Sequence, residues 1–333
     1  MNCVQKIKVA DEDEGIRLDR WFKRWFPDIA HGRLQKWLRT GQVRVDAGRA
    51  KSSTRVYPGQ TIRIPPMGGV SGQDRKPTRK AFEISAKDAA AMRNLVLHRD
   101  DHVIALNKPA GLAVQGGSGT RRHVDGFLEA LRFGSGNRPC LVHRLDKDTS
   151  GVLLLARTAA VARQLTASFK SKDVQKLYWA IVVGAPRPQH GVIDLGVAKL
   201  PGMRGERMVP NTKEGKRALT NYRVLDKVGR KAAWVAFEPL TGRTHQIRVH
   251  AAEALETPIL GDGKYGGREA FIDGEGIARQ LHLHARVLRL PHPDGGIFEC
   301  VAPLPTHMKA TLQALGLSVQ PEYDKFMQLD VIG

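Results

Sequence analysis

Cysteine is scarce in this chain, and no two cysteines have the spacing of a metal site. The 333 residues include three, Cys3, Cys140 and Cys300, which lie far apart. So small and odd a number is typical of proteins that fold in a reducing compartment without disulfide bonds. His282 and His284 alternate within a strand-like run, and no nearby cysteine or carboxylate completes a ligand set. We therefore expect neither a disulfide framework nor a bound metal.

Long hydrophobic runs are also missing. No apolar stretch approaches the roughly 18 residues that a membrane-spanning helix requires. The first residues show no apolar signal-peptide core and lead into four acidic residues at 11–14. These absences predict a cytoplasmic protein with no membrane partner. No dimerisation element is evident, so we expect a monomer.

Negative charge is in short supply relative to positive charge. Lys and Arg number 53 against 33 Asp and Glu, which gives a formal net charge of +20. An excess of this size is typical of proteins with a polyanionic partner. Charge alone does not separate nucleic acids from anionic membranes, but the sequence has no amphipathic anchor or lipidation motif. We therefore expect a nucleic acid partner.

Residues 15–64 have a pattern of their own, with twelve Lys and Arg against three Asp, a net charge of +9. Two stretches of apolar residues at helical spacing precede short strands. The opening Arg17-Leu18-Asp19, the helix closing at Gly41 and the segment Pro58-Gly59 resemble the S-four-type RNA-binding module, which implies a grip on the RNA backbone. A small α+β domain with incidental charge is the alternative. The family usually has Asn-Gly in its hairpin, whereas Asp-Ala-Gly at 46–48 predicts a turn one residue longer.

The remaining chain predicts a linker, one large domain and a tail. Residues 65–82 are rich in Pro, Gly and basic side chains, as in a flexible linker. Strand-like runs dominate residues 95–305, which favours an α+β domain with a large mixed, mainly antiparallel sheet. Residues 311–333 are expected to form a loosely attached C-terminal tail. We expect strands at 102–106, 152–156, 177–183, 232–237 and 281–290, and helices at 158–169 and 246–255.

The most informative segment is the nonapeptide 143–151, His-Arg-Leu-Asp-Lys-Asp-Thr-Ser-Gly. It holds two carboxylates, three basic side chains and two hydroxyls, and the apolar run 152–156 follows at once. The apolar run predicts a short core strand bounded by a glycine. A polar loop that enters a buried strand is a place where a rigid scaffold presents reactive groups.

This nonapeptide resembles the signature of the RluA-type RNA pseudouridine synthases, and other segments match that family in order. The resemblance implies the pseudouridine synthase fold, no cofactor, and Asp146 as the catalytic carboxylate that acts at the anomeric carbon of a uridine. The other reading of Asp146 is a local cap or salt bridge, as for most loop aspartates. The further matching segments are 107–114, 175–184, 241–248 and 261–266.

The resemblance also assigns roles to five other residues. Tyr178 stacks on the target uracil, and its hydroxyl is a candidate to relay the proton lost from the ring. Arg243 pairs with Asp146, and Ile247 packs on the other face of the uracil. Arg144 fills the space that the flipped base leaves, although a plain ion pair is an alternative. Lys264 assists electrostatically near the cleft. Arg248 and His250 are equally well explained as phosphate contacts or as structural residues.

The sequence therefore predicts an isomerase that flips uridines out of RNA and converts them to pseudouridine. Ser150 and the loop 115–119 are most similar to the RluC branch, which implies large-subunit ribosomal RNA as the substrate. Two alternatives remain open. One is a non-catalytic RNA-binding or ribosome-assembly factor on the same scaffold. The other is a hydrolase, which would release free uracil where an isomerase releases none.

Overall fold

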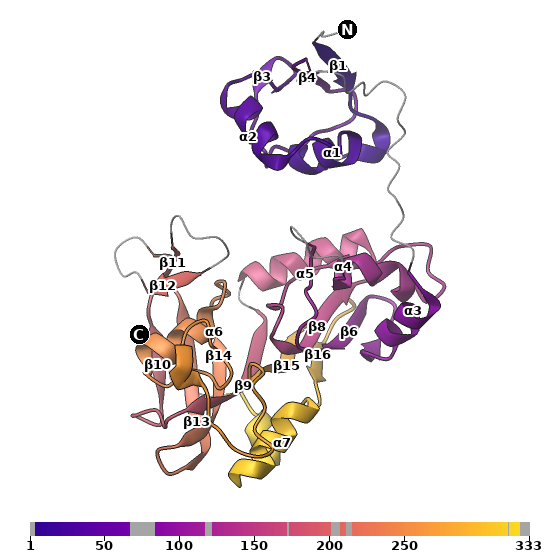
Figure 1. Cartoon of the computed structure of the whole chain (residues 1–333). Coiled ribbons are helices and arrows are strands. Elements are labelled where there is room, and N and C mark those ends of the chain that lie inside the picture. Colours follow the sequence, from indigo (N-terminus) through magenta and orange to yellow (C-terminus); the bar gives the residue numbers. More distant parts are fainter. Residues whose placement is uncertain are drawn as a thin grey trace. The chain divides into compact units, whose positions relative to one another are not determined.

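A computed structural model describes residues 4–66, 84–116, 122–171, 173–200, 207–210, 215–318 and 320–326. The chain divides into two compact units, Met1–Glu83 and Ile84–Gly333, which are drawn in Figure 1. Most of the linker predicted at residues 65–82 lies outside the described residues. In the described part of the chain, no helix is long and apolar enough to cross a membrane, and no group of three or more His, Cys, Asp or Glu is placed to hold a metal ion.

The first unit packs two helices against a four-stranded sheet in the order β1-β4-β2-β3. Its core contains the apolar faces predicted for both helices, with Trp21 and Phe22 almost completely buried. Strand β1 precedes the range 15–64 and pairs antiparallel with β4. The elements are β1 (Gln5–Lys8), α1 (Leu18–Trp25), α2 (His31–Arg39), β2 (Arg44–Val45), β3 (Gly48–Arg49) and β4 (Thr61–Ile64), with a 3-10 turn at Asp11–Asp13.

The hairpin between β2 and β3 differs from the expectation. Val45 pairs with Gly48, so the loop has two residues, Asp46 and Ala47, and is not longer than usual. Both have positive φ, 47° and 64°. This is the backbone that a two-residue hairpin turn needs and that Asn-Gly supplies without strain. Gly48 does not form the turn, because it is already the first residue of β3.

The second unit is built on one large sheet. In the described residues it has ten strands, in the order β10-β13-β14-β9-β15-β8-β6-β5, with β16 on β15 and β7 on β8. Every pairing between these strands is antiparallel except that of β15 with β8. The mixed, mainly antiparallel α+β prediction is therefore confirmed. The strands are β5 (Val96–Arg99), β6 (Val103–Lys108), β7 (Cys140–Leu141), β8 (Ser150–Ala156), β9 (Gln175–Val183), β10 (His190–Asp194), β13 (Leu219–Val228), β14 (Ala232–Pro239), β15 (Leu283–Pro291) and β16 (Ile297–Val301), and β11 (Val197–Lys199) pairs with β12 (Met208–Pro210) as a separate ribbon.

Helices cover parts of this sheet. Val161 and Leu165 of α5 pack on the apolar side chains of β8, and Figure 1 shows α5 lying along that end of the sheet. All seven residues of β8 and all eight of β14 are buried, which explains their continuous apolar sequences. The helices are α3 (Ala86–Arg93), α4 (Val124–Phe127), α5 (Ala159–Ser171), α6 (Gln246–Val249) and α7 (Thr306–Leu315), with 3-10 turns at Leu128–Leu131, Gly267–Ala270 and Pro321–Asp324 and a π-helical turn at His250–Ala254.

The prediction of a loosely attached tail at residues 311–333 is wrong for the first part of that range. Helix α7 buries Met308, Leu312 and Leu315 in a cluster with Trp179 and Trp234. These side chains recur at helical spacing, so they form one apolar stripe facing the core. Gly316, with φ of 69°, ends the helix in the left-handed conformation. Residues 327–333 lie outside the described part of the chain.

The parallel contact between β8 and β15 brings the nonapeptide against the centre of the sheet. Ser150 and Gly151 lie beside His284 and Ala285, and Ser150 Oγ is 2.9 Å from His284 Nδ1. Gly151 has a φ of 110°, and a Cβ there would lie 2.1 Å from the carbonyl oxygen of Ala285. Both the backbone conformation and the close approach therefore require glycine.

We predict that Gly151→Ala lowers the free energy of unfolding by about 3 kcal/mol or more, because two backbones would have to separate. Chemical denaturation followed by circular dichroism measures the loss. Gly136→Ala is the matched control, since a Cβ there meets nothing within 4 Å. A Gly151→Ala protein as stable as this control would contradict the close approach.

Candidate active site

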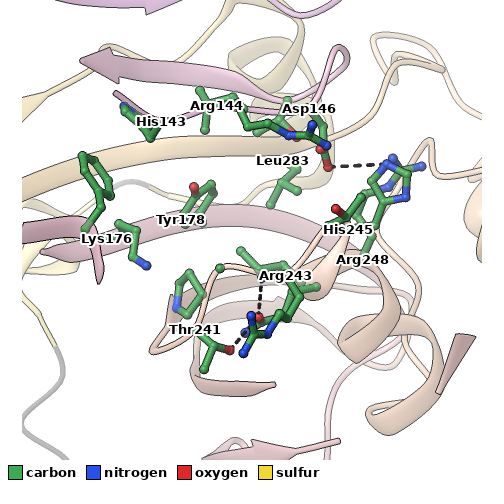
Figure 2. Close-up of a pocket in the computed structure, with 18 of the residues that line it drawn as sticks. His143, Arg144, Asp146, Lys176, Tyr178, Thr241, Arg243, His245, Arg248 and Leu283 are labelled. Carbon is green, nitrogen blue, oxygen red and sulfur yellow. Dashed lines mark hydrogen bonds and ion pairs between the residues drawn. The ribbon is translucent and has the colours of Figure 1, made fainter. Parts of the chain in front are cut away.

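Three segments that are distant in the sequence meet around one cavity of about 560 Å³. They are the loop before β8, one face of β9, and the segment between β14 and α6, as Figure 2 shows. Asp146, Arg144, Tyr178, Arg243 and Ile247 all line this cavity. Lys264 lies on a second cavity, to which Asp146 also contributes. The structure therefore gathers every predicted site residue around Asp146.

A buried lysine holds the loop that carries Asp146. Lys108, at the end of β6, is completely buried. Its Nζ donates to the carbonyl oxygens of Pro109, Leu112 and Lys147 at 2.9, 2.8 and 3.0 Å. Burial lowers the pKa of Lys108 to about 8, against the attraction of the nearby aspartates. One ammonium thus ties the turn after β6 to the residue that follows Asp146.

Asp146 lies opposite a histidine that the sequence did not single out. Its Oδ2 is 3.7 Å from His245 Nε2, and its side chain is 23% exposed. His245 has a left-handed backbone, with φ of 53°, directly before α6. Its Nδ1 is 2.6 Å from the hydroxyl of Tyr265, which accepts a hydrogen bond from the Met208 amide. If the Tyr265 hydroxyl donates to Nδ1, the proton of the ring sits on Nε2 and faces Asp146.

The Arg243–Asp146 ion pair implied by the resemblance is not formed in the described residues. Arg243 Nε donates to the carbonyl oxygen of Arg217 at 3.2 Å, and Figure 2 places the side chain beside Thr241, away from Asp146. In this arrangement the His245 imidazole, and not the Arg243 guanidinium, lies close to the carboxylate. Arg243 still lines the same cavity as Asp146.

Arg248, for which two roles were open, is held in a buried ion pair. Its Nε and Nη2 donate to the two oxygens of Asp262, both at 2.7 Å. Burial works to lower the pKa of Arg248, but the hydrogen bonds and charge of Asp262 outweigh it and raise the pKa. The guanidinium carbon also lies 5.0 Å from the centre of the Tyr265 ring. Arg248 therefore anchors α6 and the Tyr265–His245 contact, which is a structural role.

His250 is likewise buried, with Nε2 3.0 Å from the carbonyl oxygen of Leu195.

The walls of the cavity near Asp146 are apolar. Tyr178 is half-buried on β9, and Ile247 and Leu283 line the same space. Burial raises the pKa of Tyr178 above its ordinary value, and the charge of Asp146 raises it further. The phenol therefore stays protonated at neutral pH. An aromatic ring and aliphatic side chains beside a carboxylate suit a flat ring whose reacting atom faces Asp146.

The charge around the cavity has one sign apart from Asp146. Among the described residues, five Lys and Arg side chains line it, and Asp146 is the one carboxylate. Such a wall attracts an anionic ligand. The five cations are Arg144, Lys170, Lys176, Arg243 and Arg248.

Residues 102–253 match the family described as RNA pseudouridylate synthase. The chain is 37% identical over 317 residues to "Ribosomal large subunit pseudouridine synthase C" of Yersinia pestis, covering 94% of this chain and 96% of that protein. It is 35% identical over 317 residues to the protein of the same name in Escherichia coli K12, covering 94% and 97%.

Two solved human structures have a similar fold. "Human RNA Pseudouridylate Synthase Domain Containing 4" is 32% identical, with a TM-score of 0.59, and the match covers 69% of this chain and 96% of that chain. "Human RNA Pseudouridylate Synthase Domain Containing 1" is 27% identical, with a TM-score of 0.53, and covers 68% and 96%.

We predict that Arg248→Met lowers the free energy of unfolding by about 3–5 kcal/mol, because it leaves Asp262 charged and buried without its partner. The double variant Arg248→Met/Asp262→Leu should recover much of this loss. Denaturant titration measures both. Arg279→Met is the control, since its ion pair with Asp273 is highly exposed and should be worth less than about 1 kcal/mol. Equal losses in the single and double variants would contradict the reading.

Proposed function

The chain belongs to the RNA pseudouridylate synthase family, as a member of its RluA type, and from this premise we propose that it converts uridines of large-subunit ribosomal RNA to pseudouridine with Asp146 as the catalytic carboxylate. The names of its relatives in Yersinia pestis and Escherichia coli support the substrate. The observation that carries the assignment of Asp146 is its position as the one carboxylate lining an otherwise cationic cavity. The alternative of a non-catalytic RNA-binding factor is not favoured.

The reaction breaks the bond between ribose C1′ and uracil N1 and makes one between C1′ and C5. Asp146 either attacks C1′, as the nucleophile of a retaining glycosidase does, or removes a proton from C2′ so that a glycal forms. In both cases the bonding electrons leave with uracil. After the base has turned, C5 bonds to C1′. In the first route this breaks the ester between C1′ and Asp146, and in the second C2′ takes its proton back from Asp146. C5 then loses its hydrogen as a proton, and N1 gains a proton. The product is an isomer of the substrate, so no cofactor is required.

Tyr178 and Ile247 hold the uracil in this proposal. They come from β9 and α6 and line the cavity that contains Asp146. Because burial keeps the phenol of Tyr178 protonated, its hydroxyl suits hydrogen-bond donation to the base. It is a poor acceptor for the proton lost from C5 unless it gives up its own proton at the same time.

The nitrogen-bearing side chains near Asp146 serve the carboxylate and the RNA. His245 lies 3.7 Å from it and orients it. Arg243 holds a single carbonyl oxygen, a contact that RNA binding can replace, and we propose that Arg243 then pairs with Asp146. Arg144 takes the place of the extruded base, because a guanidinium both stacks on bases and binds phosphates. Lys264, on the neighbouring cavity, adds positive potential for the backbone.

We assign RNA backbone binding to the first unit as an S-four-like domain, on its net charge of +9 over residues 15–64 and its two basic helices. We propose residues 95–305 as the catalytic domain. We also propose a cytoplasmic location, which the sparse cysteines support, and a monomeric state.

Asp146→Asn is expected to abolish turnover and keep RNA affinity within about threefold, since it removes the charge without changing the shape. Tritium release from unmodified ribosomal RNA labelled at uridine C5 measures turnover, and filter binding measures affinity. Asp148→Asn, two residues away and exposed, is the control and should keep the rate. Wild-type turnover by Asp146→Asn would refute the catalytic assignment, and release of free uracil would indicate a hydrolase.

Arg243→Met is expected to reduce the single-turnover rate about 100-fold or more, the size of effect seen when an electrostatic partner is lost from an active site. Arg217→Met is the control. Arg217 contributes only its backbone carbonyl to the contact with Arg243, and its side chain pairs with Asp194 at the surface. Rates within threefold for the two variants would show that Arg243 does not act with Asp146.

A further inference from the structure

Lys176 is a cation that the mechanism above leaves unused. It lies on β9 two residues before Tyr178, so both side chains point to the same face of the strand and both line the cavity. The side chain is half-buried, and burial lowers its pKa. Among the described residues, no hydrogen-bond acceptor or carboxylate pairs with its ammonium group. A partly desolvated ammonium without a partner is costly, so a ligand is the natural source of the missing anion.

The neighbours of Lys176 do not supply that anion. His143 is neutral, because burial and then the charge of Lys176 lower its pKa to about 3, and its Nε2 accepts a hydrogen bond from the amide of Leu154. Lys170, on α5, is another cation of the same cavity. Asp146 is the one carboxylate that lines it, and Figure 2 shows Asp146 and Lys176 on opposite sides of Tyr178.

We propose that the ammonium group of Lys176 binds an anionic oxygen of the RNA substrate, and that this oxygen is a carbonyl oxygen of the uracil released from ribose. The inference rests on the proposed function. The ribose end of the nucleotide faces Asp146 and the base lies on Tyr178, so the edge of uracil far from N1 points toward Lys176.

The charge balance of the reaction fits this position. When the C1′–N1 bond breaks, both electrons stay on uracil, and the negative charge spreads from N1 to the carbonyl oxygens. A fixed cation at the far edge stabilises this anion more than it stabilises the neutral uracil of the substrate, which lowers the barrier to cleavage. When C5 attacks C1′, an electron pair of the uracil anion forms the new bond, and the negative charge on the base is removed. Lys176 keeps its proton throughout, so the step needs no further reactant.

A phosphodiester oxygen is the other source of the same chemistry, and the two predict different measurements. A contact with the uracil anion exists only after cleavage begins, so its loss lowers the single-turnover rate and leaves the Kd for RNA unchanged. A phosphate contact is present in the bound state. Its loss therefore weakens binding and makes the slope of log Kd against log salt concentration shallower by about one.

The experiment compares wild type, Lys176→Met, Lys176→Arg and Lys227→Met on one ribosomal RNA transcript tritiated at uridine C5. Lys227 is the matched control, because it is an exposed lysine on strand β13 that does not line the cavity. We expect Lys176→Met to lower the single-turnover rate about 100-fold with an unchanged Kd. Lys176→Arg should recover part of the rate, and Lys227→Met should match wild type. Thermal melting checks folding, and Lys176→Gln replaces the Met variant if that protein does not fold.

Each outcome decides the proposal. A lower rate at constant Kd supports the uracil oxygen, and a weaker Kd with a shallower salt slope supports the phosphate oxygen. If Lys176→Met has the rate and Kd of the wild type, the role of Lys176 is overturned. The proposed function stands in that case, because the wild-type protein still turns over. A wild-type protein that binds the transcript but releases no tritium would overturn both.

Discussion

The placement of Asp146 depends on one buried ammonium group. Lys108 has no exposed surface, and its three hydrogen bonds go to carbonyl oxygens on both the turn after β6 and the nonapeptide loop. A buried charge is tolerated when every proton is bound, as here. Replacing it would leave the carbonyl oxygens of Pro109 and Leu112 without this donor, while that of Lys147 would keep only the Gly111 amide. The loop is held at its other end by the requirement for glycine at residue 151. The loop that carries Asp146 is therefore fixed by backbone contacts on both sides.

With the carboxylate fixed, the surrounding charges divide into two kinds. Arg248 is neutralised by Asp262 and holds Tyr265, which in turn holds His245 near Asp146. The charge of Arg248 therefore has a structural role. Lys176 has no such partner in the described residues and stands on the far side of Tyr178. Cleavage creates positive character at ribose and negative character on uracil. A carboxylate at one end and an ammonium at the other therefore stabilise both developing charges. The arrangement favours the separated state over the intact nucleotide.

Much of the fold could be predicted from the sequence, wherever a local pattern of residues determines the helix or strand. The apolar face of α1, the buried runs of β8 and β14 and the segments around Asp146 are short-range signals, and the structure has them as expected. The missed features depend on contacts between distant segments. His245 and Asp146 come from segments that are distant in the sequence and lie 3.7 Å from each other. The strands β14 and β15, which flank β9, supply no described partner for the ammonium group of Lys176. The prediction of a loosely attached tail was wrong for its first part, because α7 packs against Trp179 and Trp234, which lie far away in the chain.

The chemistry of the cavity also limits what it can select. In the proposed mechanism, Asp146, Tyr178, Ile247 and Lys176 serve a ribose carbon, a flat ring and a developing charge, and every uridine has these. Such contacts alone do not distinguish one uridine from another. That choice must come from RNA contacts outside the cavity, and the charge of residues 15–64 suits backbone contacts, which read shape and not base sequence. Exchange of the first unit between relatives should therefore change which uridine is modified more than how fast it reacts once bound.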